Sequence, residues 1–399
     1  MRNNIYKKEI RKKCILCGNC SAVCPQNAIS YDNVNERVTI DKKLCINCGI
    51  CIKNCPATDD KRINNTLFGD IYRIYAGYSN DETIRFKAAS GGILTQTLKY
   101  LIENKFVDKV LITDFKSDFL QSESYFTNNI DEVINACGSK YQIVNVNKTL
   151  KTVLKDDLKY AFVGLPCHHI GLEKFIKTNP KIKNRIVYKF AICCSHNCNI
   201  NILDYVTHYL KIKREDIKSI KYRGDGWPEY LTVTTKNNEK LKFPQNIWNN
   251  LFLAFFYTPK QCFNCTDFCG ENADISFADA WLEEYTSKDS SGYNLVFSHN
   301  KNGEDLLQKM YKEHTINLIE HSERELVNAQ IIGLIYKKYI YKSKQPINLI
   351  LKILIRFNSF ISTQSFFKFV KPTFLRYYFY VLNLIFIRTQ LKKFKKVNK

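Results

Sequence analysis

Methionine, tryptophan and proline are scarce in this chain, with two, three and nine residues among 399. The low proline content, together with a 45% share of hydrophobic residues, excludes a low-complexity or disordered chain. A long apolar run is also lacking, because the mostly apolar stretch 377–387 falls far short of the ~20 residues that span a bilayer. The length instead predicts a globular protein of about two or three domains with ample core.

Acidic residues are absent from the C-terminal part of the chain. Residues 331–399 contain fifteen Lys and Arg and no Asp or Glu, so they carry most of the net charge of +22. Within them, 346–362 and 373–396 have apolar faces interrupted by basic residues, which fits helices lying on an anionic membrane surface. Docking of these helices on the body or a partner is the alternative. Nucleic acid is disfavoured, because no recognised binding motif accompanies the charge.

Cysteine, by contrast, is abundant, with sixteen residues. The segment 1–13 is charged and lacks the apolar core of a secretory signal, so we expect a cytoplasmic protein, with the basic tail as a route to the inner face of the membrane. A reducing cytoplasm argues against a disulfide framework.

Eight of the cysteines form two runs with the same spacing, C-x2-C-x2-C-x3-C-P, beginning at Cys14 and at Cys45. Zinc sites usually show two ligand pairs separated by a longer loop. This run instead is the one that wraps a 4Fe–4S cluster, and in two-cluster ferredoxins the fourth cysteine of each run ligates the other cluster. The spacing therefore predicts one cluster on Cys14, Cys17, Cys20 and Cys55, and a second on Cys45, Cys48, Cys51 and Cys24.

A second domain follows, in which strands alternate with helices. The pattern predicts a helix beginning after Gly92, a strand over 108–115, a strand, tight turn and helix over 159–177, and a strand over 185–194. A hairpin turning at 237–238 follows. Such alternation favours an α/β domain with a largely parallel sheet. We therefore expect a two-cluster ferredoxin domain over 1–60, a linker over 61–82 with a weak strand, an α/β domain over 83–330, and a helical basic tail over 331–399.

The stretch AASGG at 88–92 is a candidate binding turn before the first of these helices. Ligands of α/β sheets bind where strands end and helices begin. Glycine lets a ligand approach the backbone, and a helix N-terminus offers N–H groups to a phosphate. The alternative is that Ser90 simply caps the helix.

The remaining cysteines include a candidate for a third metal site. Cys167 follows a proline where a helix is expected to begin, a position that lowers a thiol pKa and favours thiolate. His168 and His169 are expected to be polar first-turn residues rather than ligands. Cys262 and Cys265 need one or two distant thiolates to complete a site, for which their spacing allows zinc and the ferredoxin module favours a third iron–sulfur cluster. Elsewhere, a lone cysteine is expected as a small buried hydrophobe at position 137.

The order of these motifs resembles the coenzyme F420 hydrogenase/dehydrogenase beta subunits, over roughly residues 14–299. The matching pieces are AASGG at 88–92, GSKY at 138–141, FVGLPCHHIGL at 162–172, FAICCSHN at 190–197, YRGDGWP at 222–228, CFNC at 262–265 and ADISFADAW at 273–281. Each is weak alone, but their order behind a ferredoxin module is specific. The likeness does not extend into the basic tail.

The resemblance implies an iron–sulfur flavoprotein that holds FAD in its α/β domain, and some members of the family oxidise or reduce coenzyme F420. It implies that the ligands of the third cluster are Cys167, Cys194, Cys262 and Cys265. The choice of Cys194 over Cys193 follows the family's segment after the strand, and Cys269 has no counterpart. The flavin pocket implied by the resemblance includes Ser90, Gly91, Gly92, Lys140 and Tyr141.

Our first hypothesis is therefore an oxidoreductase that passes electrons between a reduced donor, coenzyme F420 or ferredoxin, and an organic substrate. Many bacterial members of the family look like redox components of sugar or cell-surface polysaccharide pathways. The alternative is an electron-transfer adaptor that feeds a partner enzyme and has no substrate of its own. A basic membrane-attached scaffold with structural clusters is a third reading. No catalytic residue is predicted, and the partner is a redox donor or acceptor.

Overall fold

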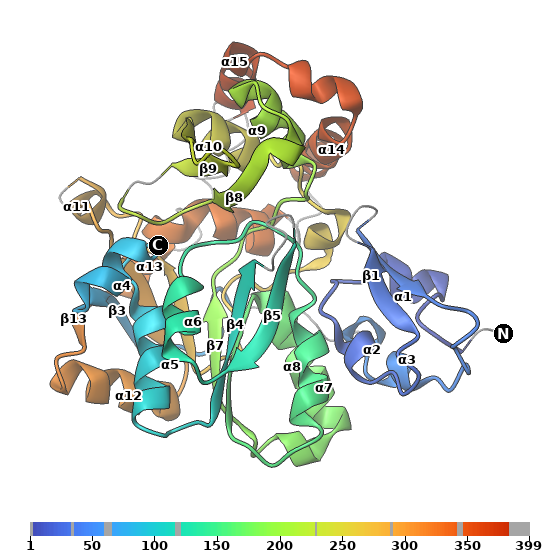
Figure 1. Ribbon diagram of the computed structural model, residues 1–399, viewed down its shortest axis with the longest axis vertical. Coiled ribbons are helices and arrows are strands. Elements are labelled where there is room, and N and C mark those ends of the chain that lie inside the picture. Colours follow the sequence, from blue (N-terminus) through green and yellow to red (C-terminus); the bar gives the residue numbers. More distant parts are fainter. Residues whose placement is uncertain are drawn as a thin grey trace.

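The computed structural model describes residues 3–32, 36–59, 66–115, 121–227, 230–287, 290–340 and 346–382. In this part of the chain, a small N-terminal module lies beside a large sheet covered by helices, and a lobe that includes the C-terminal helices lies above the sheet (Figure 1). The predicted mixture of α and β structure is confirmed. The second predicted tail stretch, 373–396, lies outside the described residues beyond residue 382, and so do positions 61–65 of the expected linker.

The N-terminal module repeats one local structure twice. Its elements are α1 (Lys8–Lys12), α2 (Asn19–Ala22), β1 (Ile29–Asp32), β2 (Arg37–Ile40), α3 (Ile50–Lys53) and η1 (Pro56–Thr58). Leu16 and Asn47 take positive φ at equivalent places in the two cysteine runs, and Gly18 and Gly49 do so just before α2 and α3. The repeated cysteine spacing thus corresponds to a repeated backbone turn.

The large sheet has the strand order β13-β3-β12-β11-β7-β6-β4-β5. Its strands are β3 (Arg73–Ser79), β4 (Lys109–Phe115), β5 (Ser122–Thr127), β6 (Tyr160–Gly164), β7 (Ile186–Ile192), β11 (Ile275–Asp279), β12 (Asn294–Ser298) and β13 (Ile316–Glu320). Parallel pairing joins β4, β6, β7 and β11, whereas β5, β12, β3 and β13 pair antiparallel to their neighbours. The largely parallel sheet predicted above is therefore correct for the centre and wrong for the flanks.

The strand β3 also corrects a predicted boundary. It lies within the stretch 61–82 that was expected to be a linker, yet it pairs with both β12 and β13 inside the large sheet. The burial of Ile74, Tyr75 and Ala76 shows why, since these apolar residues fill the core on both faces of the sheet. The second half of the expected linker is thus an internal strand of the α/β unit.

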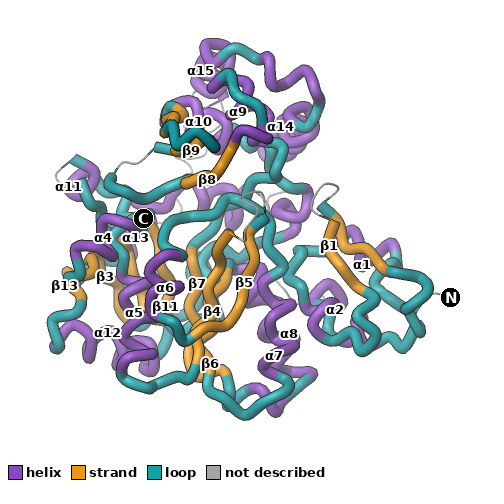
Figure 2. Tube along the Cα trace, in the orientation of Figure 1, coloured by secondary structure: helices purple, strands orange, loops and turns teal. Residues whose placement is uncertain are grey.

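Helices cover both faces of the sheet, as Figure 2 shows in purple around the orange strands. Apolar residues of α5 (Ile93–Glu103) and α12 (Lys301–Lys312) pack on one face. The other face carries α7 (Leu150–Val153), α8 (Pro166–Thr178) and α13 (Glu323–Leu334). Shorter helices are α4 (Glu82–Lys87), α6 (Ile130–Asn135), α11 (Glu283–Thr286), η2 (Val146–Thr149), η3 (Pro180–Ile182) and η5 (Lys260–Asn264). This layering buries strands on both sides, as a parallel centre requires.

The upper lobe has its own core around a three-stranded sheet. It contains α9 (Ile202–Leu210), η4 (Arg214–Asp216), β8 (Ile217–Lys221), β9 (Leu231–Thr235), β10 (Lys240–Phe243) and α10 (Gln245–Leu253). The predicted hairpin is confirmed, with Asn238 in the left-handed region at φ 64°. The tail is helical where described, as η6 (Ile335–Ile340), α14 (Pro346–Ser362), η7 (Ser365–Phe369) and α15 (Pro372–Leu382). None of the described helices is long and apolar enough to cross a membrane.

Candidate redox site

The N-terminal module gathers its eight thiols into two interleaved groups. Burial, then the charges of Cys17, Cys14 and Cys55, and last that of Cys51, raise the pKa of Cys20. A cavity of about 20 Å³ is lined by the other four cysteines, Cys24, Cys45, Cys48 and Cys51. The fourth cysteine of each run therefore lies with the first three of the other run, which is the arrangement of a two-cluster ferredoxin.

A third group of thiols lies where the central strands end. Cys167 stands in the first turn of α8, Cys194 follows β7, and the remaining pair comes from η5 and the residue after it, at 262 and 265. Burial, and then the charges of the other three thiols, raises the pKa of Cys167. The expected lowering of this pKa by the helix N-terminus is therefore wrong, because burial among like groups outweighs it.

The spacing of these four thiols suits a cluster better than a single zinc ion. With zinc–sulfur bonds of about 2.3 Å, four ligands would lie within about 4 Å of one another. Among the described residues, only Glu284, His321 and Glu325 bring three candidate ligand atoms within 4.8 Å of each other. The thiols are thus more widely spaced, as for a multi-iron cluster whose cysteines each reach a different iron.

A buried lysine, Lys337 of η6, accompanies this third group. Its side chain is 2% exposed and lines the same cavity as the four thiols. Burial lowers the pKa of Lys337, and the four nearby thiol groups raise it by more, so the net direction is upward. Sequence reasoning missed this residue, since it is one of many lysines in the basic tail and carries no motif.

The other cysteines of the α/β unit are placed differently. Cys269 is fully buried in the core with Cys193 packed nearby, and its Sγ lies 3.3 Å from the carbonyl of Phe68. Cys198 is buried in the core of the upper lobe. Cys137 was expected to be a buried hydrophobe, but it is half-buried on the cavity wall, where its thiol donates to Thr95 Oγ1 at 3.3 Å.

A cavity of about 790 Å³ adjoins the third group of thiols. Its wall runs from the start of α5 across the middle of β4 and the ends of β6, β7 and β11 to α10 and α13. Several lining residues were not predicted from the sequence, namely Arg223, Trp248, Phe252, Trp281 and Gln330. Arg223 and Trp281 lie within motifs quoted above but were not singled out there, whereas Trp248, Phe252 and Gln330 lie outside those motifs.

The predicted flavin residues of the first turn divide into two kinds. Ser90 and Gly92 line the cavity, whereas Gly91 is not among its lining residues. A Cβ on Gly91 would come within 2.5 Å of the Gly77 carbonyl, so this glycine permits close packing on β3. The helix-capping alternative for Ser90 is wrong. Its hydroxyl donates to the Tyr293 carbonyl at 2.5 Å, and the first N–H of α5 is capped by Asn294 Oδ1 at 3.0 Å.

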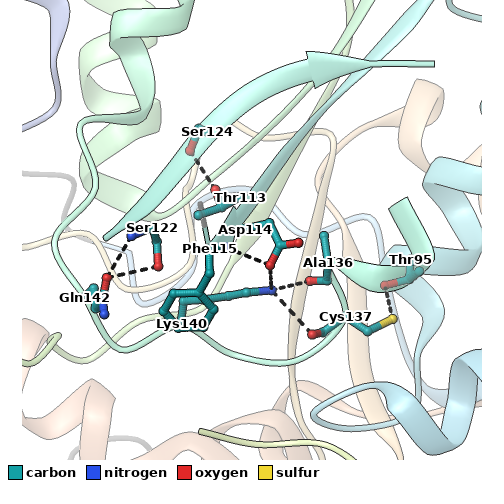
Figure 3. A network of polar contacts seen from close by, with 10 residues as sticks. All are labelled: Thr95, Thr113, Asp114, Phe115, Ser122, Ser124, Ala136, Cys137, Lys140 and Gln142. Atoms are coloured by element: carbon teal, nitrogen blue, oxygen red, sulfur yellow. Dashed lines mark hydrogen bonds and ion pairs between the residues drawn. The ribbon is translucent and has the colours of Figure 1, made fainter. Parts of the chain in front are cut away.

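Lys140, the predicted cation of the pocket, is held by protein groups at the cavity wall (Figure 3). Its Nζ lies 3.4 Å from Asp114 Oδ1 and donates to the Ala136 carbonyl at 2.5 Å and the Cys137 carbonyl at 3.4 Å. Only 8% of the side chain is exposed, so it is no ordinary surface lysine, and burial lowers its pKa. The neighbouring predicted residue, Tyr141, packs its ring against an aromatic group of the upper lobe.

In the segment YRGDGWP, the residue that lines the cavity is the arginine rather than the tryptophan. Arg223 lines the cavity, pairs with Asp279 Oδ2 at 2.7 Å and donates to the Ala89 carbonyl at 2.6 Å. Trp227 packs on Trp281 with ring centroids 4.7 Å apart. Pro228 lies outside the described residues.

The two histidines after Cys167 serve the fold. His168 accepts from the backbone N–H of Leu165 through Nδ1 and bonds the Val144 carbonyl through Nε2, each at 3.0 Å. His169 bonds the Phe190 carbonyl at 2.9 Å. Burial lowers their pKa values to about 4 and about 3, so both rings are neutral.

Polar contacts join the N-terminal module to the α/β unit beside the third group. Asn19 of α2 donates to the Gly171 carbonyl of α8 at 2.7 Å. Asn264, between Cys262 and Cys265, donates to the Cys14 carbonyl at 3.0 Å. Ile15 and Leu16 line the large cavity. The thiols on the Cys14 side of the module are therefore the ones nearest the third group.

The fold and the grouped thiols first define the class of the protein, which is that of iron–sulfur proteins that transfer electrons. Residues 74–151 match the family model for the coenzyme F420 hydrogenase/dehydrogenase beta subunit N-terminus, and 157–324 match the model for its C-terminus. Residues 13–58 match a 4Fe–4S dicluster domain. The chain belongs to the coenzyme F420 hydrogenase/dehydrogenase beta subunit family, so the resemblance and the presence of 4Fe–4S clusters are confirmed.

Individual relatives are similar at low identity. The coenzyme F420 hydrogenase subunit beta of Methanococcus voltae is 26% identical over 291 residues, covering 67% of this chain and 98% of that protein. The coenzyme F420-dependent sulfite reductase of Methanocaldococcus jannaschii is 23% identical over 321 residues, covering 77% of this chain but only 47% of the longer relative. A chain of the F420-reducing [NiFe] hydrogenase complex from Methanosarcina barkeri matches with a TM-score of 0.52 and 18% identity, over 74% of this chain and 91% of that one. The last comparison establishes the fold alone.

Proposed function

We propose that this chain is an iron–sulfur flavoenzyme that moves electrons between a reduced donor and an organic substrate. The donor is coenzyme F420 or a reduced ferredoxin. The observation that carries the proposal is the continuous order of sites, from the exposed Cys48 through two thiol groups of the N-terminal module to a third group on the wall of a 790 Å³ cavity. An electron path needs this succession, whereas a purely structural use of the cysteines does not.

The residues of the cavity fit a flavin. Its volume lies in the range of about 300–1,000 Å³ typical of ligand pockets, and apolar walls alternate with a few polar groups. Such a cofactor, when bound, accepts a hydride and releases electrons singly. The buried Lys140–Asp114 and Arg223–Asp279 pairs keep the charges on this wall fixed in place, so they would orient a polar ligand. The third group of thiols, with Lys337, would hold a cluster against the same cavity.

The test is the cofactor content of anaerobically purified protein. We expect about twelve iron and twelve sulfide per chain and one FAD. The paired substitution Cys262→Ser and Cys265→Ser should remove about four iron, whereas the control Cys269→Ser should remove none.

About eight iron and no flavin in the unmodified protein would contradict the proposal. The chain would then be an electron-transfer adaptor for a partner enzyme, the alternative drawn from its sequence. The relatives include hydrogenase and dehydrogenase subunits, which is why a redox partner is plausible in either case. A role in sugar or polysaccharide metabolism stays a prediction, to be tested by screening sugar substrates for flavin reoxidation.

A further inference from the structure

The helix α14 exposes a second apolar face in addition to the one that it buries with Leu351 and Ile355. A helix on the outside of a globular protein buries an apolar stripe and shows water a polar one. In α14 the polar residues Asn358, Ser359 and Ser362 are buried, at 1%, 5% and 2% exposure. Ile353 and Phe357, by contrast, are exposed by 60% and 54%. The exposed side of the helix therefore carries large apolar groups at positions where a surface helix usually has polar ones.

The buried polar groups fix this orientation through hydrogen bonds to the body. Asn358 donates to the Ala254 carbonyl at 2.8 Å, and Ser359 donates to the Thr258 carbonyl at 2.5 Å. Ser362 Oγ accepts from the backbone N–H of Tyr257 at 2.7 Å. A rotation that hid the apolar face would break all of these bonds and leave buried carbonyl groups unpaired. These hydrogen bonds therefore keep the apolar face of α14 exposed.

Exposed apolar side chains continue along the rest of the described tail. We call these residues the tail surface: Leu349, Ile350, Ile353, Phe357, Phe360, Phe366, Phe369, Phe374, Tyr377 and Tyr380, each exposed by 48–69%. They lie on α14, η7 and α15, which sit together at one end of the molecule (Figure 1). So many exposed aromatic and aliphatic groups on neighbouring elements mark an interaction surface rather than scattered surface residues.

The charge of the tail selects the kind of partner. Residues 331–399 carry fifteen basic and no acidic side chains. Lys371 and Arg376 are exposed beside the apolar groups, and Lys368 lies over the Phe369 ring at 5.2 Å. Aromatic and aliphatic groups flanked by basic residues fit the headgroup layer of an anionic membrane. The matched family segment ends at residue 324, so the tail surface lies outside the part shared with hydrogenase and dehydrogenase subunits.

We propose that the tail surface binds peripherally to an anionic lipid bilayer. The inner face of α15 docks on the upper lobe through Leu375 and Leu382, and that of α14 packs through Leu351 and Ile355 on the core of the α/β unit, while the outer faces enter the headgroup layer. Both uses of the tail weighed from the sequence thus apply, one to each face. The proposal is independent of the cofactors, because it rests on no thiol and no cavity residue.

The test is sedimentation of the full, anaerobically purified protein with lipid vesicles. We expect it to bind vesicles that contain phosphatidylglycerol and to stay in solution with pure phosphatidylcholine. The triple substitution Ile353→Gln, Phe357→Gln, Phe360→Gln should weaken binding about tenfold or more without altering iron content. The pair Lys371→Gln and Arg376→Gln should weaken binding and its salt dependence.

A matched control changes three exposed apolar residues elsewhere. Tyr72→Gln, Tyr311→Gln and Ile319→Gln alter side chains exposed by 54%, 43% and 45%, away from the tail, and should leave vesicle binding unchanged. Failure of the unmodified protein to bind anionic vesicles would overturn the proposal, as would equal losses in both triple variants. A concentration-dependent dimer without lipid, abolished by the tail triple variant, would assign the surface to a second copy instead.

Discussion

At the scale of single residues, the environment of Lys337 is the least ordinary feature of the molecule. An ammonium group that is 2% exposed would normally lose its proton to escape desolvation. Here the four thiols of the third group line the same cavity and raise its pKa. A fixed positive charge beside a cluster stabilises its reduced, more negative state, so Lys337 is expected to tune a redox potential rather than to ligate iron.

Replacing Lys337 tests this role. Lys337→Gln should lower the midpoint potential of the proposed third cluster by on the order of tens of millivolts, because the reduced state loses its nearby charge. The charge-preserving Lys337→Arg should restore much of the potential if it folds. An anaerobic potentiometric titration followed by electron paramagnetic resonance measures both, with the Cys262→Ser, Cys265→Ser protein identifying the signal. Unchanged potential in a Gln variant that retains its iron would show that the lysine serves packing only.

The buried imidazole of His299 predicts how stability depends on pH. Its ring bonds Ser276 Oγ at 2.7 Å and the Asp70 carbonyl at 2.8 Å. Burial lowers its pKa, outweighing the carboxylates of Glu271, Asp274 and Asp70, which act in the opposite direction. As the pH drops below about 6.5, this histidine takes up a proton in the unfolded chain but stays neutral in the folded chain. The free energy of unfolding should therefore fall below about pH 6.5.

His299→Gln should reduce that slope by up to one proton, about 1.4 kcal/mol per pH unit. Urea unfolding of the anaerobic protein between pH 5.5 and 7.5 measures it. Parallel slopes for variant and parent would refute the assignment to His299.

At the scale of elements, α8 connects two groups of thiols. Its first turn carries Cys167, and one turn later Gly171 lies against Cys17 of the N-terminal module. At 1.5 Å per residue, these positions are about 6 Å apart along the helix axis. The close approach depends on glycine, since a Cβ there would lie 2.5 Å from Asn147 Nδ2 and 2.9 Å from Cys17 Sγ.

Gly171→Ala should therefore disturb the contact between module and sheet. Alanine favours a helix by about 1 kcal/mol, but overpacking against Asn147 and Cys17 costs about 1–3 kcal/mol, so a net loss is expected. The iron content of the Cys14 group should fall, and the thermal transition of the module should shift downward. The exposed α8 position Lys177→Ala is the control and should change neither. A fully stable, fully loaded Gly171→Ala protein would mean that the two units are not held by this contact.

At the scale of the whole molecule, the two ends of the inferred electron path face different surroundings. The cavity is enclosed by the sheet, α10 and α13, whereas the other end, at Cys48, is exposed. Leu44, Ile46 and Ile50 are exposed around it by 47%, 62% and 39%. An apolar rim beside an exposed thiol group fits brief contact with a protein electron donor or acceptor.

Ile46→Glu should slow electron exchange with a protein donor such as ferredoxin about tenfold, by placing a charge in the contact. Reduction by dithionite, which needs no such contact, should keep its rate. Ile319→Glu, at the far edge strand β13, is the control. Stopped-flow absorbance at the iron–sulfur band separates the two donors. If both donors slow together, the substitution has damaged the cluster rather than the contact.

The sequence alone determined the features that depend on short spacing. The two cysteine runs, the helix after Gly92 and the hairpin at 237–238 were predicted because each is set by neighbours along the chain, and the structure contains all of them. The family motifs likewise anticipated which four thiols of the α/β unit come together. The pattern could not say how strands pair across the sheet, so the weak strand that became β3 was assigned to a linker and the antiparallel flanks were missed.

Only the tertiary structure decided the rest, because it depends on residues far apart in the chain. Burial raises the pKa of Cys167, whereas the sequence predicted a lowered pKa. Gly91 permits close packing on β3, and Lys140 forms an ion pair with Asp114. Lys337 lines the same cavity as the thiols because α13 and η6 pack across the end of the sheet. In α14, hydrogen bonds from Asn358 and Ser359 to carbonyl groups of the body determine which face is exposed. The positions of apolar residues along the helix cannot predict this orientation, because the groups that fix it come from other parts of the folded chain.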